Sequence, residues 1–140
     1  MKKYVLILSR NFPATHGKAG QCTSFIEQFG KTKLHTIRSN FALWAKRADA
    51  INKGAAILSV RYWSGKPYKS QQIEFCQLTK VHVQQLQNPT DLQTARIDNH
   101  CFSWHTVAAN DGLSYVDFCD WFKIRQDKPM AIIQFTDFQY

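Results

Sequence analysis

The sequence predicts an α+β fold, a small β-barrel with two or three flanking helices. Five to seven short apolar segments have the composition and alternation of β-strands, and several are joined by turn residues typical of hairpins. Two or three other segments carry apolar residues at the three- and four-residue steps of a helix. The chain of 140 residues contains no repeat, low-complexity run or linker, so we expect a single domain over residues 1–140.

The first half of the chain contains two predicted strands, one loop and two predicted helices. In order they are the strand 1–8, the loop 11–20, the helix 23–29, the strand 31–38 and the helix 40–54. Thr23 and Asn40 are the expected N-caps of the two helices, because their side-chain oxygens accept hydrogen bonds from free backbone amides. Gly30 and Gly54 are the expected ends, because glycine readily takes the left-handed conformation that follows a helix.

The second half is predicted to be mostly extended. Its expected elements are a hairpin over 55–78, a strand 80–86, an irregular connector 87–94, a short strand 95–97, a helix 115–122 and a final strand 130–138. The last helix should begin after Ser114 as its cap. Its expected buried residues are Val116, Phe118, Cys119 and Phe122. The apolar run that starts at Met130 predicts a central position for the final strand.

Composition and charge narrow the classes of partner. Eighteen Lys and Arg residues against ten Asp and Glu give a formal net charge of +8, which favours a polyanion such as nucleic acid, although a generally basic surface explains it equally well. The apolar run at the N-terminus is too short for a signal peptide or a membrane span, so we expect a cytoplasmic protein without a membrane partner. The four cysteines, none in a Cys-x-x-Cys pair, should then remain free thiols.

The segment 30–38, Gly-Lys-Thr-Lys-Leu-His-Thr-Ile-Arg, contains the most informative cluster of reactive side chains. Strand alternation places Leu34, Thr36 and Arg38 on one side, and a bulged start at the glycine moves Lys33 to that side as well. Thr is a weak nucleophile until a base removes its proton, and a desolvated Lys with a lowered pKa is one such base. Arg38 is expected to anchor a phosphate or a carbonyl oxygen.

This run resembles the Gly-x-Lys-x-x-Thr-x-Arg signature of ASCH domains, which have the PUA-like fold. The resemblance implies a PUA-like small β-barrel that binds RNA or a modified nucleoside, and one bacterial branch of the family hydrolyses N4-acetylcytidine. It assigns the base to Lys33, the nucleophile to Thr36 and the arginine to Arg38. That branch also uses a Glu shortly before a helix, where this chain has Asp111, whose carboxylate reaches about one methylene less far. Glu74 is a second candidate carboxylate.

Several other residues are expected to contact nucleic acid or substrate. Trp63 and Tyr68 flank the turn of the predicted hairpin and alternate with basic residues, which is what base stacking beside phosphate contact requires. The alternative is that such aromatic residues fill the core, which we favour for Tyr62. The predicted binding residues are Arg38, His35, Trp63, Lys66, Tyr68, Arg10 and Lys18, with solvated loop charges as the alternative for Arg10 and Lys18.

We expect no metal and no cofactor. His100, Cys101 and His105 lie within six residues, but they lack a second pair of ligands, so a buried thiol beside surface histidines is the favoured interpretation. Three functions remain open. The first is an RNA- or nucleoside-binding domain with a basic cleft around the Lys-x-x-Thr-x-Arg strand. The second is an amide hydrolase acting on N4-acetylcytidine-like nucleosides, and the third is a protein-interaction domain.

Overall fold

The computed structural model describes residues 1–87, 94–122 and 128–140, and these residues form eight strands and four short helices. In chain order the elements are β1 (Lys2–Ile7), α1 (Phe25–Gln28), β2 (His35–Arg38), α2 (Phe41–Asn52), β3 (Ala56–Trp63), β4 (Gln72–Leu78), β5 (His82–Gln87), β6 (Thr94–Ile97), β7 (His100–Ser103), α3 (Trp104–Asn110), α4 (Tyr115–Trp121) and β8 (Met130–Gln134).

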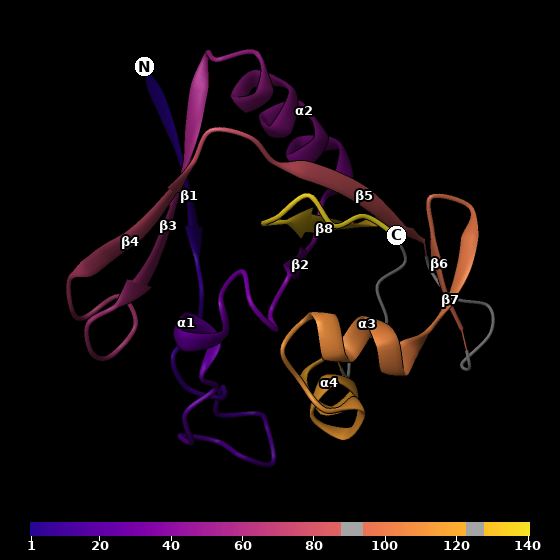
Figure 1. The fold of residues 1–140 in the computed structure, drawn as a ribbon. Helices are drawn as coiled ribbons and strands as arrows, with labels where there is room; N and C mark the ends of the chain where they lie inside the picture. Colours follow the sequence, from indigo (N-terminus) through magenta and orange to yellow (C-terminus); the bar gives the residue numbers. More distant parts are fainter. Residues whose placement is uncertain (88–93, 123–127) are drawn as a thin grey trace.

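The strands form two separate sheets, so the predicted β-barrel is wrong. One sheet has three strands in the order β1-β3-β4, and the other has five in the order β2-β8-β5-β6-β7. Within the described residues no strand of one sheet pairs with a strand of the other, and each sheet therefore keeps two edge strands instead of closing. Figure 1 shows the long β3–β4 hairpin on one side of the molecule and the β6–β7 hairpin on the other. Strand alternation predicts strands but does not define their partners.

Several predicted elements are confirmed. The Asn40 side chain caps α2 by accepting a hydrogen bond of 3.2 Å from the Leu43 amide. β3 and β4 form the predicted antiparallel hairpin, and β8 is central between β2 and β5. The predicted strand 31–38 is shorter than expected, because regular pairing begins only at His35. The N-cap of α1 is Ser24 in place of Thr23, although the Thr23 hydroxyl still accepts from the Phe25 amide at 3.2 Å.

One hairpin and one helix were missed by the sequence analysis. Asp98 and Asn99 form a two-residue turn between β6 and β7, both with positive φ (47° and 69°), which is the backbone of a tight hairpin turn. α3 follows at once, with the Ser103 hydroxyl accepting from the His105 amide at 3.2 Å. The Asp-Asn pair and the Ser cap were the available signals. Most of the predicted connector 87–94 lies outside the described residues.

The last helix begins as predicted but buries a different face. The Ser114 hydroxyl accepts from the Asp117 amide at 3.1 Å, and Phe118 is buried. Val116 is 74% exposed and Cys119 is exposed, so both predictions of burial are wrong. Asp117 takes an inward position because its carboxylate accepts a hydrogen bond of 2.7 Å from the Lys18 amine.

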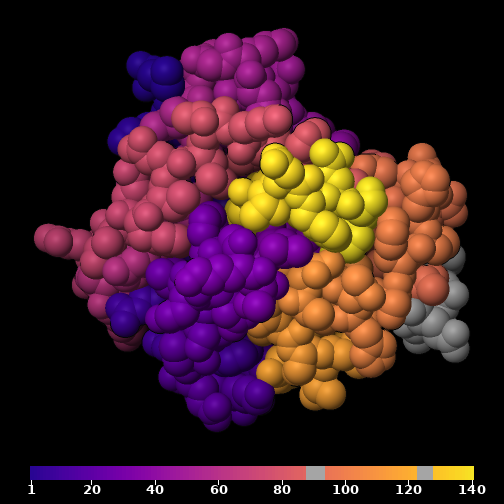
Figure 2. All heavy atoms as spheres, in the orientation of Figure 1, coloured from indigo at the N-terminus to yellow at the C-terminus, as the bar shows by residue number. Residues whose placement is uncertain are grey.

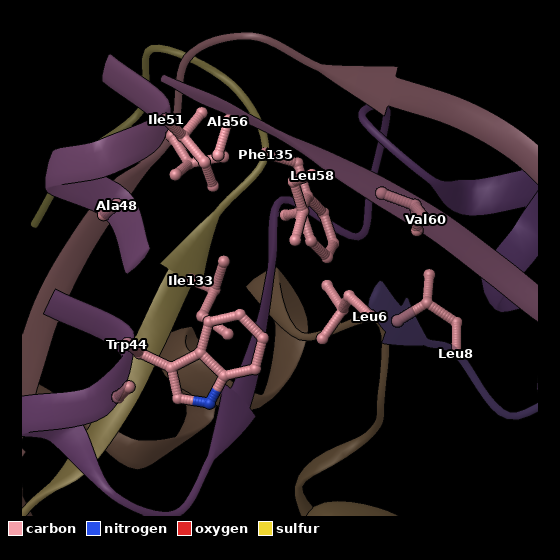
Figure 3. Packing of buried hydrophobic residues seen from close by; sticks show 12 residues of the cluster. Leu6, Leu8, Trp44, Ala48, Ile51, Ala56, Leu58, Val60, Ile133 and Phe135 are labelled. Carbon is pink, nitrogen blue, oxygen red and sulfur yellow. The ribbon is translucent and has the colours of Figure 1, made fainter. Parts of the chain in front are cut away.

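Two hydrophobic clusters lie on opposite faces of the five-stranded sheet. The first is formed where α2 packs over the sheets, and it includes Trp44, Leu58 and Phe135 (Figure 3). The second fills the space between the sheet and α1, α3 and α4. The neighbours Ile132 and Ile133 belong to different clusters, because successive side chains of a strand point to opposite faces. Among the described residues no helix is long and apolar enough to cross a membrane.

Candidate functional site

One small pocket brings together the four residues singled out around the Lys-x-x-Thr-x-Arg segment. Lys33, Thr36, Arg38 and Asp111 all line it, together with Leu8, Ser9, Phe25, Ile37, Trp121 and Phe122. Its volume is about 20 Å³, which is room for little more than a single water molecule. The contributing segments are far apart in the chain but adjacent in space. Figure 2 shows residues near 30 (purple) against residues 100–122 (orange), with the C-terminal segment (yellow) above both.

The backbone around Lys33 is fixed by contacts with the end of α3. Lys33 forms an antiparallel bridge with Asp111, and the Leu34 amide donates to the Asn110 carbonyl at 2.7 Å. Gly112 has a φ of +82°, and a Cβ added there would lie 3.1 Å from the Lys33 Cβ. Glycine therefore allows the chain after Asp111 to pass close to Lys33. Lys33 lies before the first residue of β2, so the alternation of that strand does not fix the direction of its side chain. Lys33 and Thr36 both line the pocket.

Lys33 and Asp111 form a buried ion pair. The Lys33 Nζ donates to the Asp111 carbonyl oxygen at 2.7 Å and lies 3.3 Å from the Asp111 Oδ1. It also lies 4.0 Å from the centre of the Phe25 ring, a cation–π contact. Burial lowers the pKa of the Lys33 amine, Asp111 opposes this shift, and the nearby Arg38 charge adds to it. The amine is therefore easier to deprotonate than an exposed lysine.

Thr36 lies on β2 and is only 4% exposed. Among the described residues none forms a hydrogen bond with its hydroxyl. Its strand neighbours Ile37 and Arg38 also line the pocket. The hydroxyl is available to a molecule that enters this space.

Arg38 supplies the second cation of the site. Its guanidinium donates to the carbonyl oxygens of Ile7 and Ile37, which engages two of its five N–H groups. Burial lowers the pKa of the guanidinium, and Asp111 opposes this shift. With Lys33 protonated, two cations face one carboxylate, so the pocket favours an anion or an oxygen on which negative charge develops.

His35 lies behind Asp111 and is not among the pocket-lining residues. It is completely buried, with its Nδ1 3.2 Å from the Asp111 Oδ1 and its Nε2 2.6 Å from the Tyr140 hydroxyl. His35 therefore has no exposed surface with which to contact a substrate directly, as the sequence analysis predicted it would. The sequence analysis missed Tyr140, because nothing in the local pattern of the last residues sets this tyrosine apart.

The predicted hairpin residues form a separate surface, which we call the hairpin surface: Arg10, Trp63, Lys66, Tyr68 and Lys69. Tyr68 is 89% exposed, and its ring centre lies 5.2 Å from that of Trp63. The Arg10 guanidinium contacts the Ser64 carbonyl at 3.4 Å and lies 5.2 Å from the Tyr62 ring. Tyr62 itself is half-buried and packs against Phe75 at 5.8 Å. Within the described residues the hairpin surface shares no residue with the pocket.

Three other candidates take different positions. Lys18 forms an ion pair of 2.7 Å with Asp117. Glu74 lies on β4, where it accepts hydrogen bonds from Ser59 and from Gln77 at 2.8 Å, and it is not among the residues lining the pocket. Cys101 is exposed on β7, so the expectation of a buried thiol is wrong.

In the part of the chain that the structure describes, no group of three or more His, Cys, Asp or Glu side chains could hold a metal ion. Searches of protein-family models, curated proteins and solved structures found no match to the chain. The chemistry of the site is therefore deduced from its own residues.

Proposed function

We propose that the protein is an amide hydrolase that removes a small acyl group from an acylated amine of the N4-acetylcytidine type. One observation carries this proposal: an amine, a hydroxyl, a guanidinium and a carboxylate line the same small pocket. The resemblance of the segment 30–38 to the ASCH signature points to the same substrate class. Because Lys33 and Thr36 are 1% and 4% exposed, they are poorly placed to form an open groove for a polynucleotide.

The pocket residues can perform the reaction in two stages. In the first, a neutral Lys33 accepts the Thr36 hydroxyl proton while the hydroxyl oxygen attacks the acyl carbon. Negative charge then develops on the acyl oxygen, where the Arg38 cation stabilises it. Collapse of this intermediate breaks the C–N bond, and Lys33 returns the proton to the leaving amine. In the second stage Lys33 deprotonates a water molecule, whose oxygen attacks the ester carbon. The bond from that carbon to the Thr36 oxygen breaks, Lys33 returns the proton to this oxygen, and the acyl group leaves as a carboxylic acid.

The size of the pocket constrains how a substrate binds. A volume of about 20 Å³ has room for little more than the methyl group of an acetyl substituent and excludes a whole nucleoside. The base of the substrate therefore remains outside the pocket, and Trp121 and Phe122 are the aromatic lining residues that it could contact besides Phe25. Larger acyl groups should be poor substrates, which is a direct consequence of the enclosed site.

The test is release of cytidine from N4-acetylcytidine, followed by chromatography. Wild type should turn over the substrate, Thr36→Ala should abolish turnover, and Lys33→Met should lower it by about 100-fold or more because the general base is lost. Thr36→Ser keeps the hydroxyl and should retain measurable activity. Lys53→Met removes an exposed lysine and serves as the control. Equal release by wild type and Thr36→Ala would refute the proposal.

A second candidate function, binding of single-stranded RNA, is favoured by the hairpin surface. Tyr68 is almost fully exposed and lies beside Trp63, so the two rings provide faces on which nucleobases can stack. The segment 64–71, which connects β3 and β4, contains two lysines and no acidic residue.

Fluorescence anisotropy with a labelled oligonucleotide tests this candidate. Affinity should fall steeply between about 50 and about 200 mM salt. Trp63→Ala should cost about 1–3 kcal/mol of binding free energy. Tyr115→Ala, a change at another surface aromatic residue, should have no effect. Binding that does not weaken as salt rises would contradict a surface that contacts phosphates.

A further inference from the structure

Behind the pocket, a continuous chain of hydrogen bonds leads from Lys33 to the C-terminal segment. Lys33 Nζ and His35 Nδ1 lie 3.3 and 3.2 Å from the same oxygen, Asp111 Oδ1. On its other side, the His35 ring contacts the Tyr140 hydroxyl through Nε2 at 2.6 Å. The Asn110 side-chain amide donates to that hydroxyl at 3.1 Å. One dipeptide, Asn110-Asp111, thus contacts both ends of the His35–Tyr140 pair.

One arrangement of protons gives every donor and acceptor of this chain a partner. The Asn110 amide can only donate to the Tyr140 oxygen, and the tyrosine hydroxyl then donates its own proton to His35 Nε2. In that arrangement the His35 ring carries a proton on Nδ1, from which it donates to Asp111. Burial raises the pKa of Tyr140, with Asp111 contributing in the same direction and Asn110 opposing, so the hydroxyl keeps its proton. Every member of the chain then has a partner.

The sheet holds Tyr140 in place from the opposite side. The Tyr140 amide donates to the Gln84 side-chain oxygen at 2.9 Å, and the Gln84 side-chain nitrogen donates to the Tyr140 carbonyl at 3.1 Å. Gln84 lies on the central part of the five-stranded sheet and is itself held by Gln134 at 3.1 Å. Its nitrogen also donates to Asp98 at 3.0 Å. The chain of contacts is therefore anchored on a rigid element.

We propose that His35 and Tyr140 are positioning residues that hold the Asp111 carboxylate in the orientation in which it meets the Lys33 amine. Asp111 alone can rotate about its side-chain bonds, whereas a fixed imidazole donor on Oδ1 selects one rotamer. That rotamer places the same oxygen beside Lys33 Nζ. The inference rests on the proposed function for its catalytic consequence, but the arrangement of protons can be measured without any activity.

Two substitutions at position 35 separate positioning from simple filling of space. His35→Asn places an amide N–H near the position of Nδ1 and should preserve the hydrogen bond to Asp111. His35→Gln places its amide near Nε2, loses the donor to Asp111, and should lower kcat by at least about 10-fold at unchanged KM, since displacements of about 1 Å can cost about 100-fold. Tyr140→Phe keeps the ring and removes the hydroxyl, so it should lower kcat in the same way. Tyr115→Phe is the control, because the Tyr115 hydroxyl interacts with Cys119 and belongs to no hydrogen bond of this chain.

Nitrogen NMR of the His35 ring gives a readout that is independent of turnover. In wild type at neutral pH, Nδ1 should carry the proton and Nε2 should be unprotonated, and Tyr140→Phe should shift the Nε2 resonance, because that nitrogen loses its hydrogen-bond donor. A wild-type His35 that is doubly protonated or carries its proton on Nε2 would overturn the inference, as would equal kcat in His35→Asn and His35→Gln. Failure of the hydrolase proposal can be distinguished from failure of this inference. In the first case wild type releases no cytidine, but the NMR experiment still shows which ring nitrogen of His35 carries the proton.

Discussion

Removing one partner of the buried Lys33–Asp111 ion pair should destabilise the protein, because the other charge is then left buried without its counter-charge. The two side chains are 1% and 5% exposed, so solvent barely screens them. Asp111→Ala leaves a buried ammonium whose remaining oxygen partner is the backbone carbonyl at 2.7 Å. Loss of one partner of a buried pair lowers the free energy of unfolding by about 3–5 kcal/mol. Because the hydrogen bond to the carbonyl is retained, we expect a decrease of about 3 kcal/mol. The thermal midpoint should fall by about 10 °C.

A double-mutant cycle measures the interaction within the pair. Lys33→Met replaces the amine by an apolar side chain of similar length, so the double variant no longer contains a buried unpaired ammonium. It should therefore be more stable than Asp111→Ala alone, with a coupling free energy of about 2 kcal/mol. Urea unfolding followed by the fluorescence of the four tryptophans provides the free energies. If the changes in the free energy of unfolding of the two single variants add up to that of the double variant within about 0.5 kcal/mol, the two groups do not interact as the structure indicates.

An exposed pair in the same chain is the matched control. Lys53 Nζ lies 2.8 Å from Asp49 Oδ2 on α2, but the two side chains are 70% and 63% exposed. The same cycle there should give a coupling of about 0.5 kcal/mol or less, because solvent screens the charges. The contrast tests burial as the source of the larger coupling, because the exposed pair is the closer one, at 2.8 Å against 3.3 Å for the buried pair.

Three further predictions concern backbone strain and pH. Gly112→Ala should destabilise the protein more than Gly54→Ala in urea unfolding: both glycines have positive φ, but only the Cβ at 112 would meet Lys33, whereas the space at 54 is open. Because burial lowers the pKa of Lys33 below its usual 10.5, the unfolded chain binds more protons at this amine between the two pKa values. The free energy of unfolding should therefore increase with pH between these two pKa values, and Lys33→Met should remove this increase. A hydrogen bond from Lys18 lowers the pKa of Asp117 below its usual 3.8, so this stabilisation is present above that pH and lost as the pH falls through the folded value. Asp117→Asn should flatten the acid limb of the stability profile, and an unchanged limb would contradict the assignment.

Much of the secondary structure follows from local signals. The Asn40 cap and its apolar stripe determine α2, and the turn after Trp63 determines the β3–β4 hairpin. The apolar run at Met130 correctly indicates a central strand. The missed β6–β7 hairpin depended on an Asp-Asn turn, whose signal is weaker than that of a turn containing glycine.

The candidate site was predictable only in part. Thr36 and Arg38 lie two residues apart on one strand, so alternation alone places them on the same side. Asp111 was located through the family resemblance, and no local property of the segment indicates that it pairs with Lys33. His35 was expected to contact substrate, but burial behind Asp111 gives it contacts with Asp111 and Tyr140 instead.

The sequence by itself determined most helices and strands and the local order of the Lys33, Thr36 and Arg38 side chains, because these depend on residues within a few positions of one another. Tertiary structure alone decided that the strands form two open sheets and that Asp111 forms an ion pair with Lys33. It also decided that Tyr140 reaches His35. The physical reason is that sheet partners and buried ion pairs depend on which distant surfaces pack together, and periodicity along the chain carries no information about that choice.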